Sequence, residues 1–179
     1  WIYKKVESVL RGHVLAETET ILTRVGMESS IIISANPSKQ RIVKNGQYWI
    51  NQTPLHETVF ANDPTYPAHT SDVLKLLGTP KEHELFSIAR FTPTKTKGIF
   101  VPDASNAADV EQWANWLPES YLGVGGVDFF KALLKNRHPD KSENKLPHTT
   151  NTPSSRVLIC GSLAACQSGR LENWRHRSL

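Results

Sequence analysis

Cysteine is scarce in this chain of 179 residues, which contains only Cys160 and Cys166. Two cysteines are too few for a disulfide framework, and their separation matches no common zinc-binding spacing. We therefore expect reduced thiols. The chain also has no recognisable secretory signal and no apolar run long enough to cross a bilayer. These absences favour a cytoplasmic protein that does not associate with a membrane.

A concentrated block of one charge is also absent. Lysine and arginine total 21 against 17 aspartates and glutamates, which gives a formal net charge of +4 at pH 7. The basic residues are spread along the chain rather than gathered into a stripe, so nucleic-acid binding is not indicated. A mild positive excess suits a small anionic substrate, although many enzymes with neutral substrates share it.

The most informative stretch is IYKKVESVLRGHVLAE, residues 2–17. Its first part has the pattern of a strand, and the apolar spacing from Leu10 onward predicts a helix. Ser8 is the expected helix cap, and Gly26 is placed where such a helix would end. A strand that runs into a helix presents backbone N–H groups and the positive end of the helix dipole, which together attract anions.

Basic and hydroxyl side chains surround this predicted turn, namely Lys4, Lys5, Ser8 and Arg11. Ammonium, guanidinium and hydroxyl groups are the donors that bind a small carboxylate or phosphate. The same residues could equally form a solvated strand edge followed by an ordinary helix cap. The local pattern alone leaves both interpretations open.

Strand and helix patterns alternate along the rest of the chain. The apolar run 29–35 is typical of a parallel strand that is buried on both faces, and residues 86–91 and 98–101 predict further strands. Asn45-Gly46 between two short apolar segments predicts a β-hairpin. We therefore expect a three-layer α/β domain with a mainly parallel sheet and a projecting hairpin.

Several polar residues at the ends of these elements have two interpretations. Asp103 follows a predicted strand, where it could contact a ligand or cap the next helix. Thr70 or Ser71 is the expected cap of a short helix over 73–77. Gly125 and Gly126 precede a helix, where glycine permits either an approach of phosphate to backbone N–H groups or close packing of strand and helix.

The end of the chain has a different composition. Residues 136–155 are polar and contain prolines, which predicts a linker. Residues 156–179 then begin with the apolar run VLIC and a Gly161-Ser162 turn, which predicts the start of a second α/β lobe. Residues 1–135 are accordingly expected to form the main domain.

Four segments resemble the four-carbon acid sugar kinase family in the order in which that family has them. KKVESVLRG is similar to the family's Lys-x-Asp-Ser-x-Leu-Arg-Gly signature, and QRIVKNGQYWINQTPLHETVFANDPTYPAHTSDVLKLL is similar to its next block. GVGGVDFFKALL and VLICGS resemble its glycine-rich helix start and the entry into its nucleotide-binding domain. Members of this family phosphorylate threonate, erythronate or 3-oxo-tetronate with ATP.

The resemblance implies a function and a set of site residues. It implies that Lys5, Ser8 and Arg11 bind the acid with help from Arg41, and that Mg²⁺ assists ATP. Nucleotide contacts are implied in two turns, at Gly161 and Ser162 and at Gly125 and Gly126. An exposed hairpin edge would also permit a homodimer.

The family pattern has two segments with no counterpart in this sequence, one expected before residue 1 and one after residue 179. The sequence also departs from it where Gln40 replaces the glycine before Arg41 and where Ala164 replaces a serine. Glutamine adopts positive φ less readily than glycine. We therefore expect the central part of an ATP-dependent sugar-acid kinase, with a sugar-acid-binding domain and a truncated nucleotide-binding domain. The alternative is a degenerate, non-catalytic domain that binds a small acid or acts as a scaffold.

Overall fold

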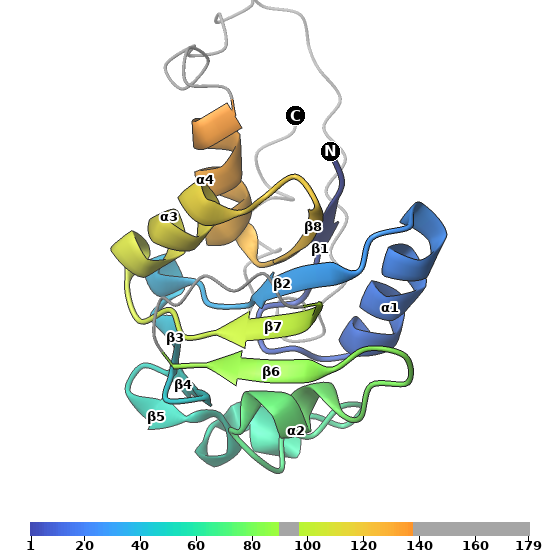
Figure 1. Ribbon diagram of the computed structural model, residues 1–179. Coiled ribbons are helices and arrows are strands. Elements are labelled where there is room, and N and C mark those ends of the chain that lie inside the picture. Colours follow the sequence, from blue (N-terminus) through green and yellow to red (C-terminus); the bar gives the residue numbers. More distant parts are fainter. Residues whose placement is uncertain (90–96, 138–179) are drawn as a thin grey trace, which may run out of the picture. The chain divides into compact units, whose positions relative to one another are not determined.

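The computed structural model describes residues 1–89 and 97–137, which form an α/β domain built on a parallel sheet (Figure 1). The strands of this sheet lie in the order β1-β8-β2-β7-β6, and every neighbouring pair is parallel. Their bounds are β1 (Tyr3–Lys5), β2 (Ser29–Ile33), β6 (Leu85–Ile88), β7 (Gly98–Pro102) and β8 (Tyr121–Gly125). The expected fold class is confirmed.

A second, antiparallel sheet contains β3 (Arg41–Lys44), β4 (Gln47–Ile50) and β5 (Thr53–Pro54). The helices are α1 (Val14–Val25), α2 (Val73–Leu77), α3 (Ala107–Trp116) and α4 (Val127–Arg137), with short 3₁₀ turns η1 (Pro37–Lys39), η2 (Leu55–Glu57) and η3 (Val59–Asn62). In the described part of the chain, no helix combines the length and the apolar character that crossing a bilayer requires.

The helices form outer layers on the parallel sheet. The connection through α1 moves from β1 to β2, whereas the connection through α3 moves in the opposite direction, from β7 to β8. Because such crossovers are right-handed, the two connections place their helices on opposite faces of the sheet. α4 packs beside α3. The sheet is thus the middle of three layers.

The central strand β2 contains the deepest part of the core. All five of its residues are buried, and Ile31, Ile32 and Ile33 are each at most 1% exposed. A strand covered on both faces needs apolar side chains on both, which explains the continuous run of isoleucine. Leu22 of α1 and Leu133 of α4 also lie in this core.

The first helix begins later than its apolar spacing predicts. α1 starts at Val14 after His13, and Ser8 is not its cap. Leu10 has φ +61° and Gly12 has φ +89°, so the backbone between β1 and α1 cannot be helical there. Residues 6–13 form a loop whose Val6, Val9 and Leu10 are buried. The helix does end at Gly26, which has the left-handed conformation expected there.

The hairpin has the predicted turn but also an anchor that the sequence did not reveal. Asn45 and Gly46 both have positive φ, as a two-residue hairpin of this kind requires. The Asp103 carboxylate accepts hydrogen bonds from both backbone N–H groups of this turn. Asp103 therefore does not cap α3, which Asn106 does. It ties the hairpin to the end of β7.

Two smaller expectations also need correction. Asp72, rather than Thr70 or Ser71, caps α2 by accepting hydrogen bonds from the N–H groups of Leu74 and Lys75. β6 runs only to Ile88, and residues 90–96 lie outside the described part of the chain.

α4 ends at Arg137, which is also the last described residue of the chain. Most of the predicted linker and all of the predicted second lobe therefore lie outside the described residues, and both stay predictions.

Gln40 adopts the left-handed conformation, with φ +53° and ψ +34°, directly before β3. This conformation costs an ordinary L-residue about 1–2 kcal/mol, whereas glycine adopts it freely at some cost in unfolded-chain entropy. We expect Gln40→Gly to raise the free energy of unfolding by up to about 1 kcal/mol in urea titrations. Lys39→Gly, one residue earlier at a negative φ, should lower it instead. A loss of stability in Gln40→Gly would contradict this account.

Glu19 of α1 holds a loop against the helix. Its carboxylate is buried and accepts backbone hydrogen bonds from Lys81, Glu82 and His83 at 2.9–3.2 Å. Burial alone would raise the pKa of Glu19, but these N–H groups outweigh it and lower the pKa below its ordinary value. The charged form is therefore the one that stabilises the fold.

We expect Glu19→Gln to lower the free energy of unfolding by about 1.5–3 kcal/mol at pH 7, because an amide cannot replace every acceptor. A lowered folded-state pKa stabilises the protein above the unfolded value of about 4.3. The difference in free energy of unfolding between the unaltered chain and Glu19→Gln should therefore become smaller as the pH falls through the folded-state pKa of Glu19. Glu119→Gln, at an exposed position in the loop before β8, is the control and should change stability by less than about 0.5 kcal/mol. A stability loss in Glu19→Gln that does not depend on pH would contradict a stabilising role for the charged carboxylate.

Candidate functional site

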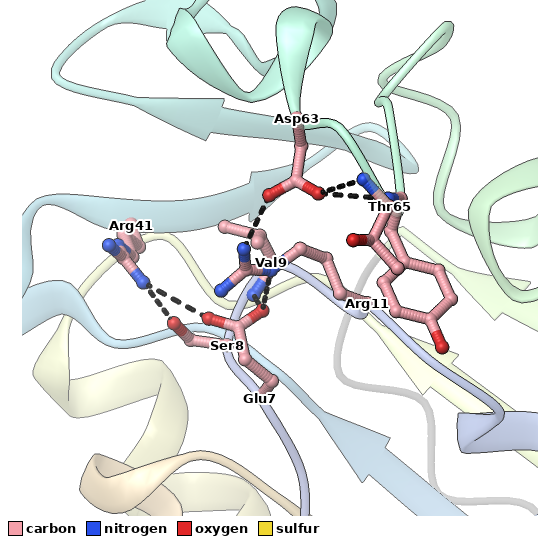
Figure 2. Close-up of polar contacts among 8 residues, drawn as sticks. Glu7, Ser8, Val9, Arg11, Arg41, Asp63 and Thr65 are labelled. Atoms are coloured by element: carbon pink, nitrogen blue, oxygen red, sulfur yellow. Dashed lines mark hydrogen bonds and ion pairs between the residues drawn. The ribbon is translucent and has the colours of Figure 1, made fainter. Parts of the chain in front are cut away.

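Three chain segments meet at the carboxyl end of β1 (Figure 2). They are the loop at residues 6–13, the first residue of β3, and the segment formed by η3 and Asp63. Arg41 donates a hydrogen bond from its guanidinium to the hydroxyl of Ser8. The same guanidinium lies 3.8 Å from the carboxylate of Glu7, measured from Nη1 to Oε1. Ser8 and Arg41, 33 positions apart, are thus brought into direct contact.

Arg11 lies between two carboxylates. Its Nη1 donates to Oδ2 of Asp63 at 2.6 Å, and its Nε donates to Oε2 of Glu7 at 3.4 Å. Oε2 of Glu7 also accepts the backbone N–H of Val9 at 2.9 Å, which fixes the carboxylate to its own loop. Glu7 therefore contacts both arginines, and Figure 2 shows it between them.

Phe60 provides an aromatic face for both guanidinium groups. The guanidinium carbons of Arg11 and Arg41 lie 5.4 and 5.6 Å from the centre of its ring. A cation at this distance from an aromatic ring is attracted by the ring's quadrupole. The Thr58 side chain caps η3 by accepting the N–H of Phe60, which helps to fix the position of the ring.

The site balances two positive charges with two negative ones. Burial would lower the pKa of Arg11, but its contacts with Asp63 and Glu7 raise it above the ordinary value. The backbone N–H groups of Tyr66 and Thr65, followed by Arg11, lower the pKa of Asp63. Arg11 and Asp63 are therefore both charged near neutral pH. A ligand carboxylate that binds here would compete with Glu7 and Asp63 for the arginines.

A pocket of about 310 Å³ opens beside Arg11. Its polar lining comes from Arg11, Thr65, Tyr66 and His69, and Phe60 and Leu76 add apolar surface. A volume of this order suits a small organic molecule. The pocket places one of the two arginines at a cavity.

The structure links three of the four expected acid-binding residues. Ser8, Arg11 and Arg41 belong to one connected network. Lys5 is exposed, and its side chain forms no hydrogen bond or ion pair within the described residues. Its neighbour Lys4 pairs with Glu17. The role of each as a ligand contact stays a prediction.

The sequence analysis did not place three residues of this site, which are Glu7, Phe60 and Asp63. Glu7 occupies the acidic position of the signature, and Asp63 belongs to an Asp-Pro pair within the second family-like block, so both had a signal in the sequence. Phe60 had none, because a single aromatic residue in a short loop is common.

Gly125 and Gly126 have a packing explanation. A Cβ atom on Gly125 would lie 2.3 Å from the carbonyl oxygen of Ile33, and one on Gly126 would lie 2.7 Å from the side chain of Asn36. The close contact of β8 with β2 thus requires glycine at position 125, and the buried Asn36 side chain leaves no room for a Cβ atom at position 126. Their nucleotide-binding role stays a prediction, as does that of Gly161 and Ser162, which lie outside the described residues.

The implied Mg²⁺ finds no matching ligand set in the part of the chain that the structure describes. Residues 1–89 and 97–137 contain no group of three or more His, Cys, Asp or Glu side chains arranged to hold a metal ion. Asp63 and Glu7 are each engaged with Arg11.

Comparisons with known proteins give the same family as the sequence motifs. A family model described as a sugar-binding N-terminal domain matches residues 1–133. The chain belongs to this family. It is 29% identical to the D-threonate kinase of Salmonella typhimurium over 74% of the chain and 35% of that protein. It is 27% identical to the D-erythronate kinase of Heliobacterium modesticaldum over 94% of the chain and 41% of that protein.

The resemblance to four-carbon acid sugar kinases is therefore confirmed, and the chain spans only 35% and 41% of the length of these two relatives. A crystal structure of a domain of unknown function from Bordetella bronchiseptica has a TM-score of 0.61 and 27% identity, over 74% of this chain and 35% of that one. That protein was solved with bound citrate as a domain-swapped dimer.

The charge network makes a prediction about Asp63. Replacement of Arg11 by methionine removes one of the groups that lower the pKa of Asp63 but leaves the backbone N–H groups of Thr65 and Tyr66. We expect the pKa of Asp63 in Arg11→Met to rise partway toward its ordinary value, as measured by NMR titration of the carboxyl carbon. Arg24→Met, on the exposed end of α1, should leave it unchanged. An unaltered Asp63 titration in Arg11→Met would show that the ion pair does not persist in solution.

Proposed function

We propose that this chain binds the carboxylate of a four-carbon sugar acid, and that the protein to which it belongs phosphorylates this acid with ATP. The observation that carries the proposal is the meeting of Arg11 and Arg41 at the ring of Phe60, with Ser8 and Glu7 between them. Two guanidinium groups from distant segments are a suitable receptor for a carboxylate.

The chemistry of the proposed ligand matches this set of groups. A four-carbon polyhydroxy acid has little apolar surface, so its binding free energy must come from hydrogen bonds and charge. Arginine can grip a carboxylate with two parallel hydrogen bonds, which a lysine cannot reproduce. Ser8 and the Glu7 carboxylate would accept hydrogen bonds from the ligand's hydroxyl groups. Lys5, exposed at the end of β1, would add positive charge at the rim.

The relatives support both parts of the proposal. Two of them are named as kinases of D-threonate and D-erythronate. The Bordetella bronchiseptica structure contains citrate, which is also a small carboxylic acid. Phosphoryl transfer depends on positioning of the acceptor hydroxyl and on stabilisation of charge, and this chain's contribution would be the first of these.

The remaining assignments belong to the same proposal. Gly161 and Ser162 would contact ATP, and the turn at Gly125 and Gly126 is a second candidate for nucleotide binding. A homodimer and a cytoplasmic location are also proposed, the former because the Bordetella bronchiseptica relative forms a domain-swapped dimer.

Calorimetry tests acid binding directly. We expect the chain to bind D-threonate or D-erythronate but not the uncharged tetrol erythritol. Arg11→Lys should weaken binding of the acid by at least about tenfold, because the loss of one charge-assisted hydrogen bond is worth about 1.5–3 kcal/mol. In the natural protein that contains this chain, Arg11→Lys should raise the KM for the acid far more than the KM for ATP.

The matched control is Arg24→Lys on the surface of α1, which should bind the acid as the unaltered chain does. Equal losses for acid and ATP in Arg11→Lys would indicate a folding defect, which circular dichroism would reveal. An unchanged affinity for the acid would contradict the proposed role of Arg11. Binding without turnover in the natural protein would favour the alternative of a non-catalytic acid-binding domain.

A further inference from the structure

Tyr48 shares a face of the hairpin with Arg41. In the β3–β4 ladder, Tyr48 lies opposite Val43 and Ile50 lies opposite Arg41. Residues directly opposite in an antiparallel pair, and those two positions away on the same strand, point to the same face. Arg41 and Tyr48 are therefore diagonal neighbours across the two strands, within reach of each other's long side chains.

The Tyr48 side chain is completely buried, yet its hydroxyl has no hydrogen-bond partner among the described residues. Burial of a hydroxyl without a partner is unfavourable, and such groups in folded proteins need an explanation. A phenylalanine would fill the same space and avoid this cost. Packing therefore accounts for the ring of Tyr48 but not for its hydroxyl.

The surroundings of the hydroxyl keep it protonated. Burial, which is the main cause, raises the pKa of Tyr48 well above its ordinary value. The Arg41 guanidinium lowers this pKa and the Glu7 carboxylate raises it, so these two of the site's four charged groups lie close enough to act on the phenol. A phenol that stays neutral at physiological pH can donate a hydrogen bond to an anion without repelling it.

We propose that the Tyr48 hydroxyl is a ligand-binding group of the acid site and donates a hydrogen bond to the bound four-carbon acid. The inference rests on the proposed function and adds a residue to it. It requires that the ligand carboxylate draws Arg41 away from Ser8 and Glu7, which opens the face that Arg41 and Tyr48 share. The Arg41 side chain is partly exposed, at 27%, and its contact with Glu7 is long, at 3.8 Å, so the ligand has mainly the hydrogen bond from Arg41 to Ser8 to replace.

Two Tyr→Phe variants form a matched pair that tests the proposal. In Tyr48→Phe we expect affinity for D-threonate and D-erythronate to fall by about tenfold. Its melting temperature should stay the same or rise, because no internal hydrogen bond is lost. Tyr3→Phe removes a hydroxyl that donates to the carbonyl of Gly126 at 2.7 Å. That variant should melt at a lower temperature and bind the acids as the unaltered chain does.

A spectroscopic measurement separates direct contact from an indirect effect. The ring Cζ carbon of a ¹³C-labelled tyrosine reports on hydrogen bonding of its hydroxyl, and the resonance that disappears in Tyr48→Phe belongs to Tyr48. We expect this resonance to shift when D-threonate is added.

Three results would overturn the proposal. They are unchanged acid affinity in Tyr48→Phe, a melting temperature lowered as far as in Tyr3→Phe, or a Tyr48 resonance that does not respond to the acid. In each case the proposed function still stands if the unaltered chain binds the acid. If the unaltered chain binds neither acid, the proposed function itself fails and this inference fails with it.

Discussion

The arrangement of the proposed acid site depends on the Glu7 carboxylate. It accepts the N–H of Val9 and contacts both Arg11 and Arg41, so one side chain joins the loop after β1 to the start of the hairpin. The parallel sheet does not create this connection, because β3 and β4 belong to a separate sheet. Asp103 fixes the far end of the same hairpin to β7. With both ends held, Arg41 has a defined position relative to Arg11.

The sequence predicted those parts of the fold that depend on local rules. The isoleucine run of β2, the Asn45-Gly46 turn and the end of α1 at Gly26 each follow from burial or from backbone conformation within a few residues. The predicted start of α1 was wrong. Leu10 and Val14 have helical spacing, but Leu10 is a buried loop residue with positive φ. An apolar residue that is buried from a loop gives the same pattern as one on a helix. Asp103 was misjudged because its partners lie more than 50 positions away.

The acid site was only partly predictable for the same reason. Ser8, Arg11 and Arg41 were found through resemblance to family motifs, and local chemistry alone could not separate them from a solvated strand edge. Asp63 meets Arg11 across 52 positions, and the contact of Phe60 with both arginines depends on the fold of η3. The unpaired hydroxyl of Tyr48 is visible only after side-chain packing is known. The sequence identifies the charged residues that are available, but tertiary structure determines which of them become partners.

The balance of charge in the site has a consequence for selectivity. Glu7 and Asp63 already neutralise Arg11 and Arg41. The binding free energy of an incoming anion is therefore only the difference between the contacts that it makes and those that it replaces. A simple inorganic anion offers no hydroxyl groups to occupy the acceptors that are released. The proposed sugar acid would offer a carboxylate to the arginines and hydroxyl donors to Glu7 and Ser8, so it would replace both sides of the exchange. Pre-paired charges therefore favour ligands that carry both groups at a fixed separation, which is a stricter requirement than negative charge alone.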